Sequence, residues 1–392
     1  MLEQQRTIAH YDLDTFFVSV ERKKDSRLDG KPLMIGGSER GVVASCSYEA
    51  RKFGVRSGMP MRVAKQLCPY AVVISGDYEA YSQASKEVRE IVAEKAPLFE
   101  QASIDEFYLD LTGMDRFFHS TMWASELRQR IIHETGLPIS MGLSVNKLVS
   151  KVATNLAKPN NLLEVKSEVV LPFLAPLALR AIPAIGPKLS QQLAYLGVPT
   201  VSILREIPQV LLQRAFGKPG HMLYQKARGI DSSQVVPSHQ QKSISTERTF
   251  REDTMDIQWL KSLLTSMVEK VAHELRQNRQ LTGCVSVKIR YANFETVSKQ
   301  AKIPFTASDR DLMSKVLALF DKLYTRRIRL RLIGLRLTKL VAGSPQLDLF
   351  EPYPKQLGLY QTMDRLKQKY GQKIVGQGSG LRQNYAPAPQ FD

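Results

Sequence analysis

The sequence predicts a multidomain α/β protein. Its 392 residues suffice for two to four domains at roughly 100–200 residues each. Segments with strand and helix patterns alternate between Ile8 and Lys166, as in a sheet that is covered by helices. Residues 244–341 then follow the order strand, helix, strand, strand, helix, strand, which is the split βαβ or ferredoxin-like arrangement.

The first sheet domain is interrupted by an insertion. Ile8 to Leu13 is apolar enough for a short strand, and a helix is expected from Thr15 with Asp14 as its N-cap. Residues 22–76 are loop-rich and form the insertion. The remaining expected elements are a helix from Tyr78, a strand in SIDEFYLDL (103–111), a helix near 120–135, a strand in LPISMGLSV (137–145) and a helix from about Asn146.

Three segments follow this domain. Residues 167–231 have a helical pattern punctuated by Pro and Gly, and the polar stretch 232–243 is typical of a linker. Within the split βαβ segment, residues 242–340 carry 20 Lys and Arg against 10 Asp and Glu, a net charge of +10. Most of the basic character of the chain is therefore concentrated in one module.

The tail, residues 342–392, has one periodic stretch. Apolar side chains recur there at helical spacing, at Leu359, Met363, Leu366 and Tyr370. This pattern predicts a short amphipathic helix that packs on the protein or binds a partner. Residues 376–392 are expected to be disordered.

Composition restricts the classes of partner. The chain has 55 Lys and Arg against 38 Asp and Glu, a net charge of +17, which favours nucleic acid first and an anionic membrane second; a solvated basic surface is the alternative. Three scattered cysteines indicate neither a zinc site nor a disulfide framework. Because no segment resembles a signal peptide or a membrane span, we expect a cytoplasmic protein without a membrane partner.

Three acids suggest a metal site. Asp105 and Glu106 are adjacent within an apolar strand pattern, and Asp12 lies in the first strand. Two-metal phosphoryl-transfer sites need several carboxylates around divalent ions, and Mg²⁺ prefers such oxygen ligands. Successive strand residues face opposite ways, so both neighbours can reach one site only where the pleat breaks, as at a hairpin end. On spacing alone, ordinary turn acids are the alternative.

Five ordered motifs carry a resemblance to a known family. They are YDLDTFFVSVE (11–21), SYEARKFGVRSGMP (47–60), SIDEFYLDLTG (103–113), GLSVNKLVSKVATNLAKPN (142–160) and IPAIGPKLSQQLAYLGV (182–198). Together they resemble the signature motifs of Y-family translesion DNA polymerases of the bacterial DNA polymerase IV type, over roughly residues 8–350. The resemblance favours metal binding by the three acids.

The resemblance implies a right-hand polymerase with a sheet-based palm, small fingers, a helical thumb that contains a helix–hairpin–helix, and a little finger. The implied boundaries are palm 1–21 and 77–166, fingers 22–76, thumb 167–231, linker 232–243, little finger 244–341 and tail 342–392. The implied activity is low-fidelity, template-directed extension of DNA primers past damaged template, with dNTPs as substrates and no proofreading exonuclease.

The resemblance also implies roles in catalysis and nucleotide binding. Asp12, Asp105 and Glu106, with the backbone carbonyl of Leu13, would hold two Mg²⁺ ions, for which Mn²⁺ could substitute. Phe17 would be the steric gate that excludes a ribose 2′-hydroxyl. The nucleotide-binding set comprises Phe16, which is also expected to pack in the core, and Ser45, Tyr48, Arg51 and Lys158; Gly37, Val42 and Gly58 would form the lid over the base pair.

Contacts with macromolecules are implied at three places. The hairpin residues Ile185 and Gly186, with Lys188, would bind a DNA phosphate without reading sequence. In the RIRLRLIGLRL stretch, Arg329 and Arg331 alternate with apolar residues and are expected to face one way, and Arg336 would add to the same DNA surface. QLDLF resembles a peptide that docks on the sliding clamp through Gln346, Leu347, Leu349 and Phe350. The protein is expected to act as a monomer.

Two other classes of function are compatible with parts of the pattern. Another palm-type nucleotidyl transferase, such as a nucleotide cyclase, would share the acidic sheet edge, but the helix–hairpin–helix and the basic module argue against it. A non-catalytic DNA-binding scaffold is disfavoured because all three acids are present. Phe107, Tyr11 and Asn161 depart from the usual wording of the family motifs, and none of them removes a proposed ligand.

Overall fold

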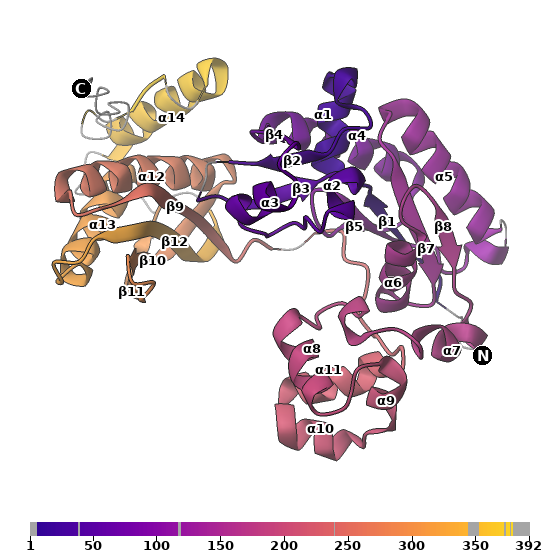
Figure 1. Cartoon of the computed structure of the whole chain (residues 1–392). Coiled ribbons are helices and arrows are strands. Elements are labelled where there is room, and N and C mark those ends of the chain that lie inside the picture. Colours follow the sequence, from indigo (N-terminus) through magenta and orange to yellow (C-terminus); the bar gives the residue numbers. More distant parts are fainter. Residues whose placement is uncertain are drawn as a thin grey trace. The chain divides into compact units, whose positions relative to one another are not determined.

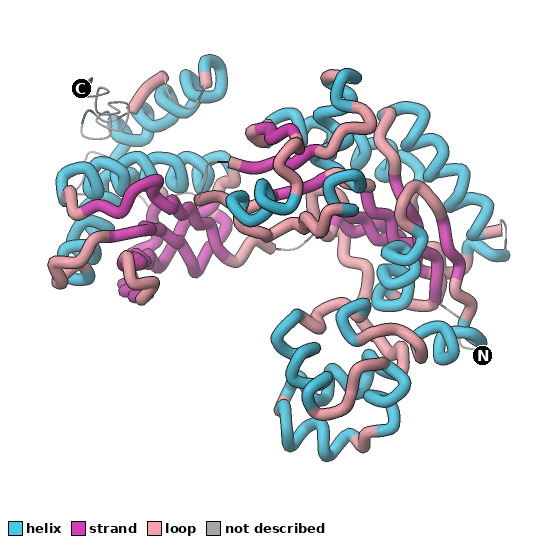
Figure 2. The backbone as a smooth tube through the Cα atoms, viewed as in Figure 1, coloured by secondary structure: helices cyan, strands magenta, loops and turns pink. Residues whose placement is uncertain are grey.

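The computed structural model describes residues 6–37, 40–116, 119–238, 240–343, 353–371, 374–376 and 378. It forms two compact units, residues 1–239 and 240–392, and the boundary falls within the predicted linker. Figure 1 shows the helices and strands of each unit, and Figure 2 shows the same backbone by secondary structure. No helix of the described part of the chain is long and apolar enough to cross a membrane.

The palm is a five-stranded sheet in the first unit. Its strands, in spatial order, are β5 (Phe99–Gln101), β6 (Glu106–Asp110), β1 (Ile8–Leu13), β7 (Ile139–Ser144) and β8 (Leu162–Glu164). The central strand β1 pairs antiparallel with both β6 and β7. The first strand of the chain therefore lies in the middle of the sheet, beside the strand that carries Glu106.

The two faces of this sheet have different partners. Tyr11 and Leu13 of β1 lie in an apolar core that includes side chains of α4 (Tyr78–Lys95) and α5 (Ser120–Thr135). The alternate residues His10 and Asp12 face α6 (Lys147–Ala157), whose Thr154 bonds to His10. Gly142 of β7 permits this approach, because a Cβ there would lie 2.1 Å from the carbonyl oxygen of Ser150 in α6.

The helix that follows β1 does not begin as predicted. Helix α1 spans Phe16–Lys24, and its N-cap is Thr15, in the left-handed conformation and without a side-chain cap. The prediction that Asp14 caps this helix is therefore wrong. Its carboxylate instead accepts hydrogen bonds from segments far away in the sequence.

The fingers fold around a small core of their own. A three-stranded sheet has the order β3 (Val43–Cys46), β2 (Leu33–Gly36), β4 (Val72–Ile74), and β2 pairs parallel with β4. Short helices α2 (Tyr48–Lys52) and α3 (Met61–Leu67) pack on it. All three cysteines of the chain are free and buried, two of them here.

The thumb consists of short helices. They are α7 (Val170–Leu174), α8 (Pro187–Tyr195), α9 (Val201–Glu206), α10 (Gln209–Phe216) and α11 (Lys218–Ala227). The predicted helix–hairpin–helix differs at its first helix, since the residues before the hairpin form only a 3-10 turn, Leu179–Ala181. Gly186 then caps α8, and the side chain of Ile185 is buried.

Part of the predicted linker is packed on the palm. The guanidinium of Arg6 donates to the carbonyl of Ser233 at 2.8 Å, and the amide of Val236 donates to Glu100 at 2.8 Å. Val235 is buried against Ile8 and Tyr108. Residues 233–236 are therefore held in place by the first unit, although their composition is that of a linker.

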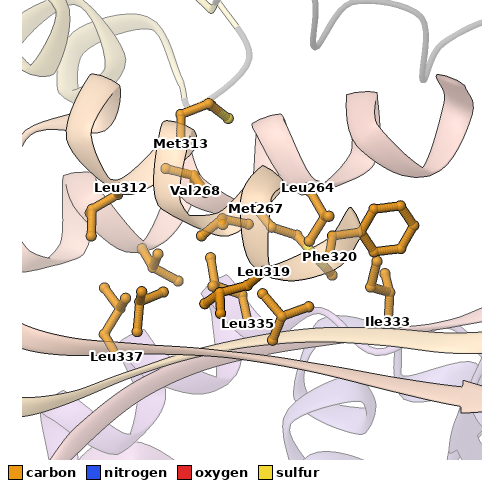
Figure 3. Packing of buried hydrophobic residues seen from close by; sticks show 14 of the residues in the cluster. Leu264, Met267, Val268, Leu312, Met313, Leu319, Phe320, Ile333, Leu335 and Leu337 are labelled. Carbon is orange, nitrogen blue, oxygen red and sulfur yellow. The ribbon is translucent and has the colours of Figure 1, made fainter. Parts of the chain in front are cut away.

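The little finger has the predicted order of elements. It comprises β9 (Ser243–Thr254), α12 (Ile257–Gln277), β10 (Gln280–Tyr291), β11 (Thr296–Thr306), α13 (Asp309–Leu323) and β12 (Leu330–Ala342). The sheet order is β11-β10-β12-β9, so the fourth strand of the module, β12, lies between its first two strands, β9 and β10. In the ferredoxin-like arrangement, the third strand of the module lies between the first two. Figure 3 shows side chains of α12 and α13, such as Val268 and Phe320, packed on Leu335 and its neighbours in the sheet.

A bulge changes the predicted alternation of arginines in this sheet. Arg329 precedes β12, and a register shift lies between Leu330 and Leu332, so Leu330 and Ile333 both enter the core. The guanidinium of Arg331 stacks on Phe294, with 4.6 Å between the guanidinium carbon and the ring centroid, while Arg336 is exposed further along the strand. The simple alternation from Arg329 onward therefore does not hold.

The predicted tail helix exists, but it packs through a different face. Helix α14 spans Tyr353–Tyr370, and its Asp364 forms an ion pair with Arg276 and a hydrogen bond with Nδ1 of His273, both on α12 and both at 2.7 Å. The predicted apolar stripe is largely exposed, with Leu359 and Tyr370 each 58% accessible. An ionic network, rather than the apolar stripe, holds this helix on the little finger.

Candidate active site

A hairpin brings Asp105 and Glu106 to the same end of the palm sheet. Strands β5 and β6 pair antiparallel, and the amides of Ala102 and Ser103 turn back to the carbonyl of Glu106. Asp105 lies in this turn, and its carbonyl accepts from the amide of Leu13 at 3.0 Å. The predicted break in the pleat is confirmed, because Glu106 opens the strand while Asp105 still belongs to the turn.

Asp12 lies opposite Glu106 in the register of β1 and β6. Asp12 is only 5% exposed. Burial raises the pKa of Asp12 to about 6; the ammonium of Lys158 opposes this shift, and the charges of Glu106 and Asp105 add to it. Two separated strands thus bring three carboxyl groups into one electrostatic environment.

Two lysines stand beside these carboxylates. The ammonium of Lys158 lies 2.5 Å from Oδ1 of Asp12, and that of Lys151, from α6, contacts Glu106. Burial opposes ionisation of Glu106, but its contacts with His10 and Lys151 outweigh burial and lower its pKa to about 2. Lys158 was predicted to contact the triphosphate, and in this structure it neutralises Asp12.

His10 and Lys151 both contact Glu106, although the sequence interpretation did not select them. Nε2 of His10 lies 3.7 Å from Glu106, and burial lowers the pKa of His10 to about 4, so the ring is neutral at pH 7. Features of the neighbouring sequence could have identified both residues. His10 shares a strand face with Asp12, and Lys151 lies two helical turns before Lys158 in the same motif.

Asp12, Asp105 and Glu106 suit a hard divalent cation, both in residue type and in backbone position. Three carboxylates lie at one end of the sheet, and the charges of Glu106 and Asp105 add to the burial that raises the pKa of Asp12. The side chains as placed are turned to other partners: Asp12 to Lys158, Glu106 to Lys151, and Asp105 to the hydroxyl of Ser103 at 2.6 Å. Within the described part of the chain, no group of three or more His, Cys, Asp or Glu side chains is arranged so that it could hold a metal ion.

Phe17, the predicted gate, is held by aromatic neighbours. Its ring stacks on that of Tyr81 with a centroid distance of 4.3 Å and an interplanar angle of 11°. The Tyr81 hydroxyl donates to Glu21 at 2.7 Å in a buried contact. Tyr78 meets Phe17 edge-on, while Phe16 is 3% exposed and packs in the palm core. These contacts with Tyr81 and Tyr78 therefore hold the ring of Phe17 in its orientation.

The predicted phosphate-binding residues of the fingers lie on helix α2 and on the preceding strand β3. The guanidinium carbon of Arg51 lies 5.0 Å from the centroid of the Tyr48 ring, and the Tyr48 hydroxyl donates to Asp14 at 3.1 Å. Ser45 is nearly buried in β3. Tyr48 thus links the fingers directly to the palm.

The predicted lid residues lie around the edge of the fingers sheet. Val42 is 52% exposed and forms an isolated bridge with Pro60. Gly58 has a φ of 82° and donates its amide to the carbonyl of Val43 at 2.8 Å, a turn that favours glycine. Among the described residues, no atom lies within 4 Å of a Cβ built at Gly37.

Comparisons with known proteins agree with this geometry. Residues 11–155 match the impB/mucB/samB family, residues 241–349 match the C-terminal domain of that family, and residues 180–231 match the DNA polymerase-iota thumb domain. A DNA polymerase IV of Dehalococcoides mccartyi is 36% identical over 96% of this chain and 98% of its own length. The chain is a Y-family DNA polymerase.

Other relatives of this Y-family polymerase support the same assignment. A DNA polymerase IV of Halorhodospira halophila is 37% identical over 88% of this chain and 98% of its own length. A solved Y-family DNA polymerase chimera, Dbh-Dpo4(243-245)-Dbh, superposes with a TM-score of 0.78 at 25% identity, over 86% of this chain and all of its own. The protein is a translesion DNA-directed DNA polymerase with the right-hand architecture, and neither the cyclase nor the scaffold alternative is favoured.

Proposed function

We propose that this polymerase extends primers with the help of two Mg²⁺ ions, which Mn²⁺ can replace. Asp12, Asp105, Glu106 and the carbonyl of Leu13 would hold them. The register of Asp12 opposite Glu106, with Asp105 in the adjoining turn, carries the proposal. The ions would neutralise the charge that develops as the primer hydroxyl attacks the α-phosphate of a dNTP. Binding of Mn²⁺ to the wild type and to an Asp105→Ala variant, followed by electron paramagnetic resonance, tests this assignment.

The fingers and the end of α6 would bind the triphosphate. We infer that Arg51 offers its planar fork to phosphate oxygens and that Lys158 moves from Asp12 to supply a point charge. The hydroxyl of Ser45 would add a donor, and Tyr48, whose hydroxyl proton is given to Asp14, would line the site and support the guanidinium of Arg51 with its ring. The contact between the ring of Tyr48 and the guanidinium of Arg51 on helix α2 supports this set. Phe16 is buried, so any contact with the nucleotide would come from its backbone.

The sugar and the base pair would meet Phe17 and the lid. The stacking of Phe17 on Tyr81 supports a steric gate, because the ring of a gate has to stay in place when a ribose 2′-hydroxyl approaches it. Gly37, Val42 and Gly58 would lie over the nascent base pair. The space around Gly37, open among the described residues, supports tolerance of bulky templates.

DNA would be bound without reading its sequence, by the thumb hairpin and by the little finger. The exposed Gly186 and Lys188 lie at the start of α8, where the first-turn amides of a helix can receive a phosphate, and buried Ile185 would contribute its backbone only. Arg329 and Arg336 are exposed, and Arg331 stacks on the exposed ring of Phe294. The net charge of +10 in this module supports a broad electrostatic surface.

Binding to primer-template DNA is expected to weaken steeply with salt. If six to ten phosphates are neutralised, affinity should fall roughly 10³–10⁵-fold between about 50 and 200 mM salt. Arg336→Ala should lower the slope of log Kd against log salt by about 1. Arg130→Ala is the matched control, because Arg130 is paired with Glu94 and Glu134 on the palm. Fluorescence anisotropy measures both, and equal slopes for the two variants would remove Arg336 from the DNA surface.

The clamp-binding peptide lies outside the described residues. We propose from its sequence that Gln346, Leu347, Leu349 and Phe350 dock on a sliding clamp, and that the polymerase acts as a monomer in the cytoplasm. A tether would raise the effective concentration of the polymerase at the primer into the millimolar range.

Deleting residues 346–350 is expected to leave distributive synthesis unchanged and to abolish stimulation by the clamp. The reason is that the peptide contributes to association with the clamp and not to the palm chemistry. Primer extension with and without loaded clamp measures the effect, and Leu359→Ala, on the exposed side of α14, is the control. Full stimulation of the deletion variant would show that the peptide does not bind the clamp.

A further inference from the structure

Asp14 is a buried acid with a complete set of donors. It lies directly after β1 and is 1% exposed. Its carboxylate accepts from the hydroxyl of Tyr48 at 3.1 Å, from the hydroxyl of Ser140 at 2.8 Å and from the amide of Asn160 at 2.7 Å. A buried ionised carboxylate is stable only when such donors replace water.

The three donors come from three separate parts of the chain. Tyr48 begins helix α2 of the fingers, Ser140 lies in palm strand β7, and Asn160 follows α6. Two of these parts carry residues that are proposed to bind the triphosphate. One is Tyr48 itself, and the other is Lys158, which lies two residues before Asn160. One carboxylate therefore sets the position of both.

Arg128 of α5 supports the turn at Asn160, which follows α6. Its guanidinium donates to the carbonyl of Ile139 at 2.8 Å and to the carbonyl and side chain of Asn160 at 2.6 Å each. Asn160 has a φ of 48°, a conformation that needs outside support in a residue other than glycine. The amide of Asn160 is thus presented to Asp14 by contacts on its other side.

The chemistry of Tyr48 fits a fixed donor. Burial raises the pKa of the Tyr48 phenol well above its ordinary value, and the charge of Asp14 adds to the shift. The phenol therefore stays protonated and donates to Asp14, which holds the ring on which Arg51 lies. Loss of the acceptor would release Tyr48 and Arg51 together.

We propose that Asp14 is a positioning residue for the incoming triphosphate, which locks the start of the fingers helix α2 and the turn after α6 into one arrangement. The proposal rests on the proposed roles of Tyr48, Arg51 and Lys158. Asp14 touches neither the substrate nor the reacting atoms in this scheme. Its effect should appear in the affinity for dNTP rather than in the chemical step.

The test is steady-state single-nucleotide incorporation by the full-length polymerase. Asp14→Asn should raise the KM for dNTP about tenfold, with kcat and the Kd for primer-template DNA each changed less than about twofold, because the amide cannot accept all three hydrogen bonds. Glu100→Gln is the matched control, since Glu100 is also a buried acid, 5% exposed, and it bonds Lys147 and Val236 instead. It should lower the melting temperature comparably and leave the KM unchanged.

Two further variants keep the outcomes distinct. Ser140→Ala removes one donor with little loss of volume and should raise the KM about threefold, so it decides the question if Asp14→Asn does not fold. Arg51→Ala tests the proposed triphosphate site directly. If the KM for dNTP rises in Arg51→Ala but is unchanged in the Asp14 and Ser140 variants, the proposed role of Asp14 is overturned and the triphosphate assignment stands. An unchanged KM in Arg51→Ala would overturn the triphosphate assignment.

Discussion

Replacing Asp105 with Ala is expected to abolish primer extension, with the rate lowered roughly 10³-fold or more, as for other losses of transition-state charge stabilisation. Asp105 lies in the β5–β6 turn, where its carboxylate accepts a hydrogen bond from the hydroxyl of the nearby Ser103. The change removes little packing, so stability should be almost unaffected. Extension of a labelled primer with all four dNTPs and Mg²⁺ measures the loss.

The control for this variant is Asp110→Asn. Asp110 ends β6, the strand that follows this turn; its carboxylate accepts from the amide of Thr112, and it pairs with Ile8 at the opposite end of β1 from Asp12. It should extend primers at the wild-type rate and bind Mn²⁺ normally, whereas Asp105→Ala should lose Mn²⁺ binding as well as extension. Unimpaired extension by Asp105→Ala would remove Asp105 from the reaction, and retained Mn²⁺ binding would remove it from the metal site.

Replacing Phe17 with Ala is expected to give the polymerase the ability to use ribonucleotides, with a change of roughly 100-fold in the ratio of rNTP to dNTP incorporation. The ring is stacked on Tyr81, which is itself held by Glu21, so it cannot move aside for a 2′-hydroxyl. Truncation opens that space without altering the carboxylates. The measurement is kcat/KM for single rNTP and dNTP additions opposite the same template base.

Phe53→Ala controls for loss of an aromatic ring from the same unit. Phe53 is 44% exposed in the fingers and meets Tyr70 edge-on, away from Phe17 and its partners. This variant should keep the wild-type selectivity for deoxyribonucleotides. If Phe17→Ala rejects ribonucleotides as strongly as Phe53→Ala does, Phe17 is not the gate.

The parts of the fold that could be predicted from sequence are those set by local pattern. The apolar run of β1 and the helical period of α5, α12 and α13 require only neighbouring residues to be recognised. The turn at Asp105 was predictable for a chemical reason. Two adjacent acids cannot share a site from a regular strand, so their presence implied a break in the pleat.

The errors arise where a distant part of the chain competes for a residue. Asp14 has the composition of an N-cap, yet Tyr48, Ser140 and Asn160 take its oxygens. In α14, Asp364 forms an ion pair with Arg276 of α12, and this partly buried contact lies on a different face of the helix from the apolar stripe. Local propensity cannot rank these choices, because the energy of each depends on a partner far away in the sequence.

The sequence by itself determined the order of strands and helices, the acidic and basic character of each segment, and the family motifs that mark the reaction. The tertiary structure alone decided that Asp12 faces Glu106, that Lys158 and Lys151 neutralise them, and that Asp14 joins fingers to palm. Residue type fixes which interactions a side chain can make, but burial and the register of distant strands fix which partner is within reach.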